Sequence, residues 1–207
     1  MACLISAKKG FAKWRIRSSI SLDDYVKGHS STPSSPNIRL VRWSPPQPGT
    51  VKLNFNGSYI NSAARGGFIL RDRTGKLLKA GAANYGLTSS MVAKARAMKD
   101  GVFLAVQAGY SRISIEGDNM IVIQALKGEG QMPWQIAYII KDVKASLQHV
   151  VQVSINHTYR KPNMAAEWFS KFGHSITDFF ITGLCFSPNL VKLLLILYCN
   201  TLERRDN

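Results

Sequence analysis

Residues 51–60 read V-K-L-N-F-N-G-S-Y-I, and this run is the first strand expected in the chain. Its apolar residues alternate with polar ones, and a period of two predicts a strand with one buried face. Asn56-Gly57 is a turn signal, so we expect the strand to end at Asn56 and to present that side chain to a site. An aspartate there would be a metal ligand, whereas the carboxamide of Asn56 is neutral.

The segments that follow predict an α/β domain with a five-stranded mixed sheet flanked by helices. The first three strands are joined by short turns, which indicates an antiparallel meander. The last two strands are separated by helical segments, which indicates parallel pairing. Val92, Met98 and Phe103 are expected in the core. Beyond the first strand, strands are predicted at 66–72, 76–85, 112–118 and 150–157, and helices at 88–108, 120–126, 134–147 and 164–172.

Composition limits the classes of protein that fit. Of 207 residues, 45% are apolar, which excludes a wholly disordered chain. The net charge of +15 favours a polyanionic partner, nucleic acid before membrane. The longest apolar run, 190–199, contains Lys192 and is about half the length of a bilayer span, so no membrane insertion is expected. Three scattered cysteines indicate a reducing compartment without a disulfide framework.

Three regions differ in composition. Residues 1–41 are basic and rich in Ser and Pro, and we interpret them as a leader and linker; residues 42–175 form the domain. Residues 176–207 are predicted to be an apolar C-terminal extension that packs on the domain. The acid-free segment 1–20 fits a mitochondrial transit peptide, a disordered basic leader or a remnant of an upstream module. A nuclear, cytoplasmic or mitochondrial location therefore stays open, and we expect a monomer.

Five motifs in order carry a resemblance to a known family. The chain resembles the ribonuclease H type 1 family over residues 42–175, and in particular the plant reverse-transcriptase-like ribonuclease H domains derived from retroelements. The resemblance implies a ribonuclease H-like fold. The motifs are R-W-S-P-P-Q-P-G-T-V-K-L-N-F-N-G-S, G-G-F-I-L-R-D-R-T-G-K, A-K-A-R-A-M-K-D-G, I-E-G-D-N and H-T-Y-R-K-P-N-M-A-A-E.

The resemblance also implies a catalytic site. Family members cleave the RNA strand of an RNA–DNA hybrid with two Mg²⁺ ions held by four carboxylates, because hard cations need several anionic oxygens. In this sequence the matching positions are Asn56, Lys94, Asp118 and Glu167. Their charges add to −1 instead of −4. We therefore expect Lys94 to pair with Asp118, Mg²⁺ to bind weakly at Asp118 and Glu167 or not at all, and hydrolysis to be impaired.

Plainer interpretations of single residues remain. Asp118 fits the N-cap of the following helix, and Glu167 fits a solvated helix face. His157 matches a family histidine but equally fits a structural role, and Tyr159–Ala166 lacks the mobile histidine found in cellular family members. Trp43 is expected to lie in the core or in a lid.

Binding can persist without hydrolysis, because contacts to phosphates need only basic, hydroxyl and amide groups. Three functions stay open: a nucleic-acid-binding domain with impaired catalysis, an active RNA–DNA hybrid ribonuclease, and an interaction domain or the product of a decayed element. The residues expected to contact an RNA–DNA hybrid or structured RNA are Ser58, Asn61, Arg65, Ser89, Ser90, Arg160 and Asn163.

Overall fold

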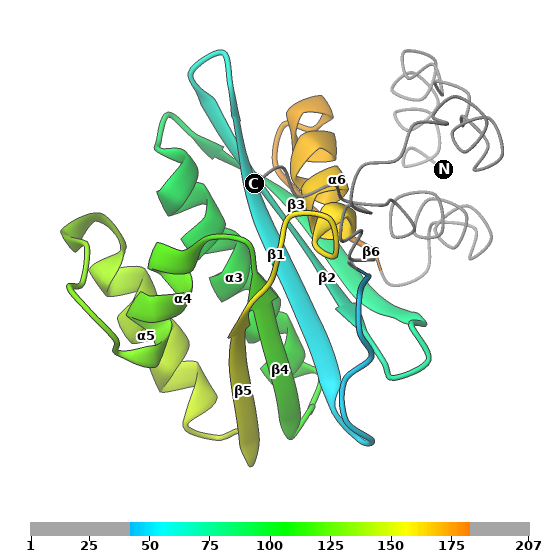
Figure 1. Ribbon diagram of the computed structural model, residues 1–207. Coiled ribbons are helices and arrows are strands. Elements are labelled where there is room, and N and C mark those ends of the chain that lie inside the picture. Colours follow the sequence, from blue (N-terminus) through cyan, green and yellow to red (C-terminus); the bar gives the residue numbers. More distant parts are fainter. Residues whose placement is uncertain (1–41, 183–207) are drawn as a thin grey trace, which may run out of the picture. The chain divides into compact units, whose positions relative to one another are not determined.

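The computed structural model describes residues 42–182, which form a mixed β-sheet with helices on both faces (Figure 1). The predicted leader 1–41 and residues 183–207 of the predicted extension lie outside the described residues. The elements in chain order are β1 (Val51–Ile60), β2 (Ala63–Arg71), β3 (Leu77–Gly86), α3 (Ser90–Gln107), β4 (Arg112–Gly117), α4 (Met120–Lys127), η1 (Trp134–Ile136), α5 (Ala137–Leu147), β5 (Gln152–His157), α6 (Met164–Phe172), η2 (Gly173–Ser175) and β6 (Phe179–Thr182).

The strand order across the sheet is β5-β4-β1-β2-β3-β6. β1, β2 and β3 form the predicted antiparallel meander, and β4 and β5 extend it in parallel on the other side of β1. The predicted fold class is therefore confirmed. The sequence interpretation missed β6, a strand of four residues that pairs antiparallel with β3 and makes six strands in this part of the chain.

Strand β1 does not end at Asn56, so the predicted turn at Asn56-Gly57 is wrong. The strand continues to Ile60, and the hairpin turn lies at Asn61 and Ser62, which both have positive φ. Such a two-residue turn matches the twist of its strands. Gly57 is needed for close packing and not for a turn, because a Cβ there would lie 2.5 Å from the backbone nitrogen of Lys94. The missing side chain lets α3 approach β1 closely.

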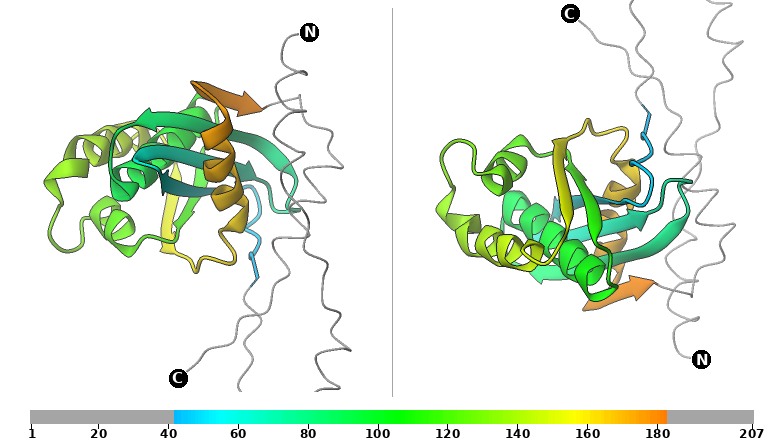
Figure 2. Two further views of the ribbon diagram at one scale, coloured as in Figure 1. Left: turned by 90° about the horizontal axis from the view of Figure 1, so that it is seen from above. Right: turned by 90° about the horizontal axis from the view of Figure 1, so that it is seen from below.

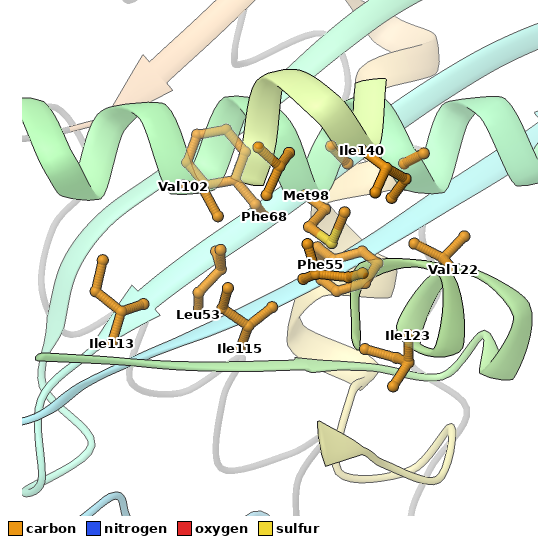
Figure 3. Close-up of a cluster of buried hydrophobic side chains, with 14 of the residues drawn as sticks. Leu53, Phe55, Phe68, Met98, Val102, Ile113, Ile115, Val122, Ile123 and Ile140 are labelled. Atoms are coloured by element: carbon orange, nitrogen blue, oxygen red, sulfur yellow. The ribbon is translucent and has the colours of Figure 1, made fainter. Parts of the chain in front are cut away.

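Helices cover both faces of the sheet (Figure 2), and each face carries a hydrophobic cluster. The larger cluster fills the space between the sheet and α3, α4 and α5, and Figure 3 shows Leu53, Phe55 and Met98 at its centre. The smaller cluster lies under α6, where Ile69 meets Phe169. Val92 and Met98 are buried as predicted, whereas Phe103 is 53% exposed and the prediction for it was wrong. Helix α3 turns Phe103 towards solvent.

Segment 42–50 packs against the sheet through Trp43. The guanidinium of Arg71 lies 4.1 Å from the centre of the Trp43 ring, and the indole Nε1 donates to Asn54 Oδ1 over 3.1 Å. Beside it the buried Lys52 ammonium pairs with Glu116 and donates to the Ser44 carbonyl. Cation–π contacts and paired charges make burial of these polar groups tolerable.

Within residues 42–182, no helix has the length and hydrophobicity required to cross a bilayer.

Candidate functional site

The parallel pairing of β1 and β4 brings two of the four predicted site residues to neighbouring strand ends. Phe55 and Gly117 are partners in this ladder, and Asn56 and Asp118 follow them directly. Asn56 is 5% exposed, and its Oδ1 has no hydrogen-bond donor within the described part of the chain. Asn56 thus supplies one neutral, buried oxygen at this edge of the site.

Helix α3 supplies the third residue, Lys94. Its N-terminus is set by Ser89, whose hydroxyl accepts a hydrogen bond from the backbone N–H of Val92. The close contact at Gly57 holds this end of the helix against β1. Lys94 Nζ donates to Asp118 Oδ1 over 2.8 Å, and both side chains are largely buried. The predicted contact between Lys94 and Asp118 is present.

Helix α6 supplies the fourth residue, Glu167, which is 7% exposed. Arg160 holds it in a fork: Nε donates to Oε2 over 3.0 Å and Nη2 to Oε1 over 2.5 Å. Lys171, one helical turn further on, lies 2.8 Å from Oε1. The Arg160 hydrogen bonds, with help from Lys171, lower the pKa of Glu167 to about 2. Glu167 is therefore an ionised carboxylate at neutral pH, and it is paired with two cations, Arg160 and Lys171.

Arg160 links the two halves of the site. Hydrogen bonding to Glu167 raises the pKa of its guanidinium, and the negative charge of Asp118 contributes in the same direction. The predicted charge of −1 counted only the four family positions. With Arg160 and Lys171 included, three cations face two carboxylates and the group carries +1.

This donor set does not fit a pair of Mg²⁺ ions. Two divalent ions need several free anionic oxygens, but Asp118 is paired with one cation and Glu167 with two. No group of three or more His, Cys, Asp or Glu side chains suited to a metal occurs within residues 42–182. Asn56 adds an oxygen without charge. The arrangement is suited instead to attracting an anion.

The plainer interpretation of Asp118 as a helix cap does not apply. Asn119 caps α4, and its side chain accepts a hydrogen bond from the Val122 N–H over 3.0 Å. Glu167 is likewise not a solvated residue. His157 ends β5 with an exposed side chain, whose ring lies edge-on to that of Tyr159.

The residues expected to contact nucleic acid fall in different places. Ser58 and Arg65 are cross-strand partners on β1 and β2, and Asn61 lies at the exposed tip of their hairpin. Ser89 and Ser90 are exposed at the N-terminus of α3, and Arg160 has a side chain 72% exposed. All six side chains are partly or fully exposed.

Asn163 is the exception, and the structure contradicts its predicted contact with nucleic acid. It is fully buried, and its Nδ2 donates to the Phe55 carbonyl over 2.9 Å. This bond ties the start of α6 to β1, which is a structural role. Its side chain turns inwards because β1 offers a buried acceptor there.

Sequence reasoning missed two residues of this region. Lys171 could have been found, because Glu and Lys four residues apart on a helix form ion pairs. His174 in η2 could not, because its Nε2 lies 3.0 Å from Ser58 Oγ, a residue 116 positions earlier in the chain. Only the tertiary structure brings them together.

Comparisons with known proteins agree with this fold. The N-terminal RNase H domain of Rv2228c from Mycobacterium tuberculosis superposes with a TM-score of 0.57 and 16% identity, over 60% of this chain and 92% of that domain. LC11-RNase H1 was isolated from compost and solved in complex with RNA/DNA hybrid. It superposes with a TM-score of 0.52 and 16% identity, over 57% of this chain and 92% of that chain. At these identities the likeness concerns the fold alone.

A relative and a family profile extend the comparison to sequence. The Arabidopsis thaliana protein named "Putative ribonuclease H protein At1g65750" is 26% identical over 141 residues, which cover 67% of this chain and 23% of that protein. This chain thus spans about a quarter of the length of that relative. The profile of the reverse transcriptase-like family matches residues 54–173, more than half of the chain and all four site positions. The chain belongs to the reverse transcriptase-like family.

Proposed function

We propose that this chain is a ribonuclease H-like nucleic-acid-binding domain whose two-metal hydrolysis is impaired. The observation that carries the proposal is the 2.8 Å hydrogen bond from Lys94 to Asp118. In the ribonuclease H type 1 family that the chain resembles, these two positions are carboxylates that bind metal. Here one of them is a cation that neutralises the other.

Electrostatics supports impaired metal binding. A divalent ion about 4 Å from an ammonium group is repelled by several kcal/mol even at the effective dielectric constant of a protein surface. Mg²⁺ at Asp118 would have to displace Lys94, and Mg²⁺ at Glu167 would have to displace Arg160 and Lys171. The Lys94–Asp118 pair is largely buried on both sides, so displacement by Mg²⁺ would leave the Lys94 ammonium unpaired in a poorly solvated place, which is costly.

The same charges support binding of a polyanion. The chain carries +15, and the three cations of the site exceed its two carboxylates by one. Arg160 keeps most of its side chain exposed while Glu167 holds it in place, so its free N–H groups can reach a phosphate. LC11-RNase H1, which shares the fold, was solved with an RNA/DNA hybrid. An RNA–DNA hybrid or structured RNA is therefore the proposed ligand.

Two assays on the purified chain test the proposal. The first measures cleavage of a labelled RNA–DNA hybrid across a range of Mg²⁺ and Mn²⁺ concentrations, with an intact ribonuclease H as positive control. We expect no turnover, or turnover several orders of magnitude below the control. Turnover near that of the control would show an active hybrid ribonuclease and overturn the proposal.

The second assay measures binding of the same hybrid, of structured RNA and of duplex DNA by fluorescence anisotropy at several salt concentrations. We expect hybrid or structured RNA to bind more tightly than duplex DNA, with an affinity that falls as salt rises, because neutralised phosphates release counterions. Absence of binding to all three would favour an interaction domain or a decayed element product.

A further inference from the structure

Beside the predicted catalytic positions, Ser58, Arg65 and His174 converge from three elements. Ser58 and Arg65 are opposite each other on β1 and β2, so their side chains share one face of the sheet. Gly173 packs over that face, since a Cβ on it would lie 3.0 Å from the Arg65 Cβ. The next residue, His174, places Nε2 3.0 Å from Ser58 Oγ. All three side chains are partly exposed, so a ligand can reach them.

Backbone carbonyls hold the guanidinium of Arg65 in a fixed orientation. Nε donates to the Gly173 carbonyl over 3.1 Å, and Nη1 donates to the Ala64 carbonyl over 2.9 Å. Five N–H bonds are available on an arginine, so several remain free. Within residues 42–182 Arg65 forms no ion pair, in contrast to Lys94 and Arg160. Its charge is oriented but not neutralised.

The pKa of His174 also indicates that the positive charge of Arg65 is not neutralised. Burial lowers the pKa of its imidazole, and the positive charge of Arg65 lowers it further. The Arg65 guanidinium and the His174 ring therefore repel each other when both are charged. A bound anion would relieve that repulsion and accept hydrogen bonds from both groups, while the Ser58 hydroxyl can turn its O–H to the same anion.

The position relative to Asn56 suggests which anion. Ser58 follows Asn56 by two residues on the same face of β1, a separation of about 7 Å along the strand. Consecutive phosphates of a nucleic acid strand are separated by a comparable distance. A strand with one phosphate near Asn56 and Arg160 can therefore place the neighbouring phosphate at the cluster of Ser58, Arg65 and His174.

We propose that Ser58, Arg65 and His174 form a phosphate subsite, which binds one backbone phosphate of a nucleic acid strand next to the degenerate metal positions. The inference rests on the proposed function, because it assigns these side chains to the same ligand. Binding of an anion at these three side chains can also be tested with inorganic phosphate alone.

The first test uses inorganic phosphate and NMR of the histidine side chains in the full chain. The chain has four histidines, and the exposed His149 and His157 serve as internal controls. We expect the ring signals of His174 to shift and saturate on titration with phosphate, and the shift to be lost in Arg65→Gln. Equal responses of His149, His157 and His174, or none at His174, would overturn the subsite.

The second test uses hybrid binding by anisotropy. Arg65→Gln should weaken binding roughly tenfold and reduce the slope of log Kd against log salt by about 0.9, the value for one phosphate contact. Arg73→Gln removes the same charge from the exposed β2–β3 turn and should change neither quantity. Ser58→Ala and His174→Gln should weaken binding with little change in slope.

Arg65→Lys keeps the positive charge but removes the guanidinium, so it separates the effect of the charge from the effect of the guanidinium geometry. It should retain the salt slope and bind less tightly than the parent chain, and circular dichroism verifies the fold of each variant. Equal binding by the parent, Arg65→Gln and Arg73→Gln would reject the subsite and leave the proposed function standing. A His174 response to phosphate in a chain that binds neither hybrid nor structured RNA would reject the proposed function and leave an anion site at these three side chains.

Discussion

Lys94 Nζ lies 2.8 Å from Asp118 Oδ1, and this ion pair joins helix α3 to the residue that follows strand β4. Its two side chains are 16% and 12% exposed, so the pair is largely shielded from water. A pair in such a position is costly to break from either side, because the remaining charge stays in a poorly solvated place. It therefore affects both stability and metal binding, and each effect can be measured.

Replacing Lys94 by Met should lower the free energy of unfolding by about 1–3 kcal/mol, because it leaves the Asp118 carboxylate unpaired. Asp118→Asn should cost a similar amount, and the double variant less than the sum of the two. Urea unfolding of the four proteins gives the coupling energy. The exposed pair of Lys99 and Asp142 is the control, with an expected coupling below about 1 kcal/mol. Equal couplings would show that burial does not strengthen the pair.

Restoring two carboxylates should restore metal binding. Asn56→Asp with Lys94→Glu changes the charge of the site, counted with Asp118, Glu167 and their cationic partners, from +1 to −2. We expect calorimetric titration with Mg²⁺ and Mn²⁺ to detect binding in the double variant and in neither single one. Lys99→Glu repeats the charge reversal of Lys94→Glu on the same helix and should not create a site. Binding by Asn56→Asp alone would contradict this expectation.

Glu167 should make stability depend on pH in the acid range. Its pKa is about 2 in the folded chain against 4.5 as the ordinary value, so its contribution is fully present above about pH 4.5 and disappears as pH falls towards 2. Glu167→Gln should therefore cost about 1–2 kcal/mol at neutral pH, after allowance for the exposed Arg160 partner, and almost nothing near pH 2. Glu129→Gln, at an exposed pair, should show no such pH dependence in denaturation experiments.

Trp43 should stabilise the sheet although it lies outside every strand. Trp43→Ala removes the ring that contacts Lys52 and Arg71 and the hydrogen bond to Asn54, and we expect the free energy of unfolding to fall by about 2–3 kcal/mol in thermal unfolding. Trp134→Ala is the matched control, because that side chain is 81% exposed. A similar loss in both variants would show that the contacts of Trp43 contribute little.

Most of the fold could be predicted because its signals are local. Alternation along β1, the cap at Ser89 and the break before α6 define the main elements. The spacing of the motifs then identified Lys94 and Asp118 as neighbours, although 24 residues separate them. That inference depended on the family resemblance and not on local pattern.

The missed features depend on tertiary contacts. Asn56-Gly57 has the local preference of a turn, but pairing with β2 and the close approach of α3 keep the strand extended there. β6 has only four residues and exists through its pairing with β3. Asn163 looked like an exposed polar residue, yet the Phe55 carbonyl draws it into the interior. No sequence pattern reports where a distant backbone acceptor lies.

The anchoring of Trp43 has a practical consequence for the choice of fragment boundaries. The similarity to the family begins at residue 54, eleven residues after the indole whose Nε1 bonds to Asn54. A recombinant fragment cut at the start of that similarity would lose the first three residues of β1, the Trp43 ring that packs on the Arg71 guanidinium and the Lys52 ammonium that pairs with Glu116. Solubility or binding failures of so short a fragment would reflect these missing groups, so expression should begin at residue 42 or earlier.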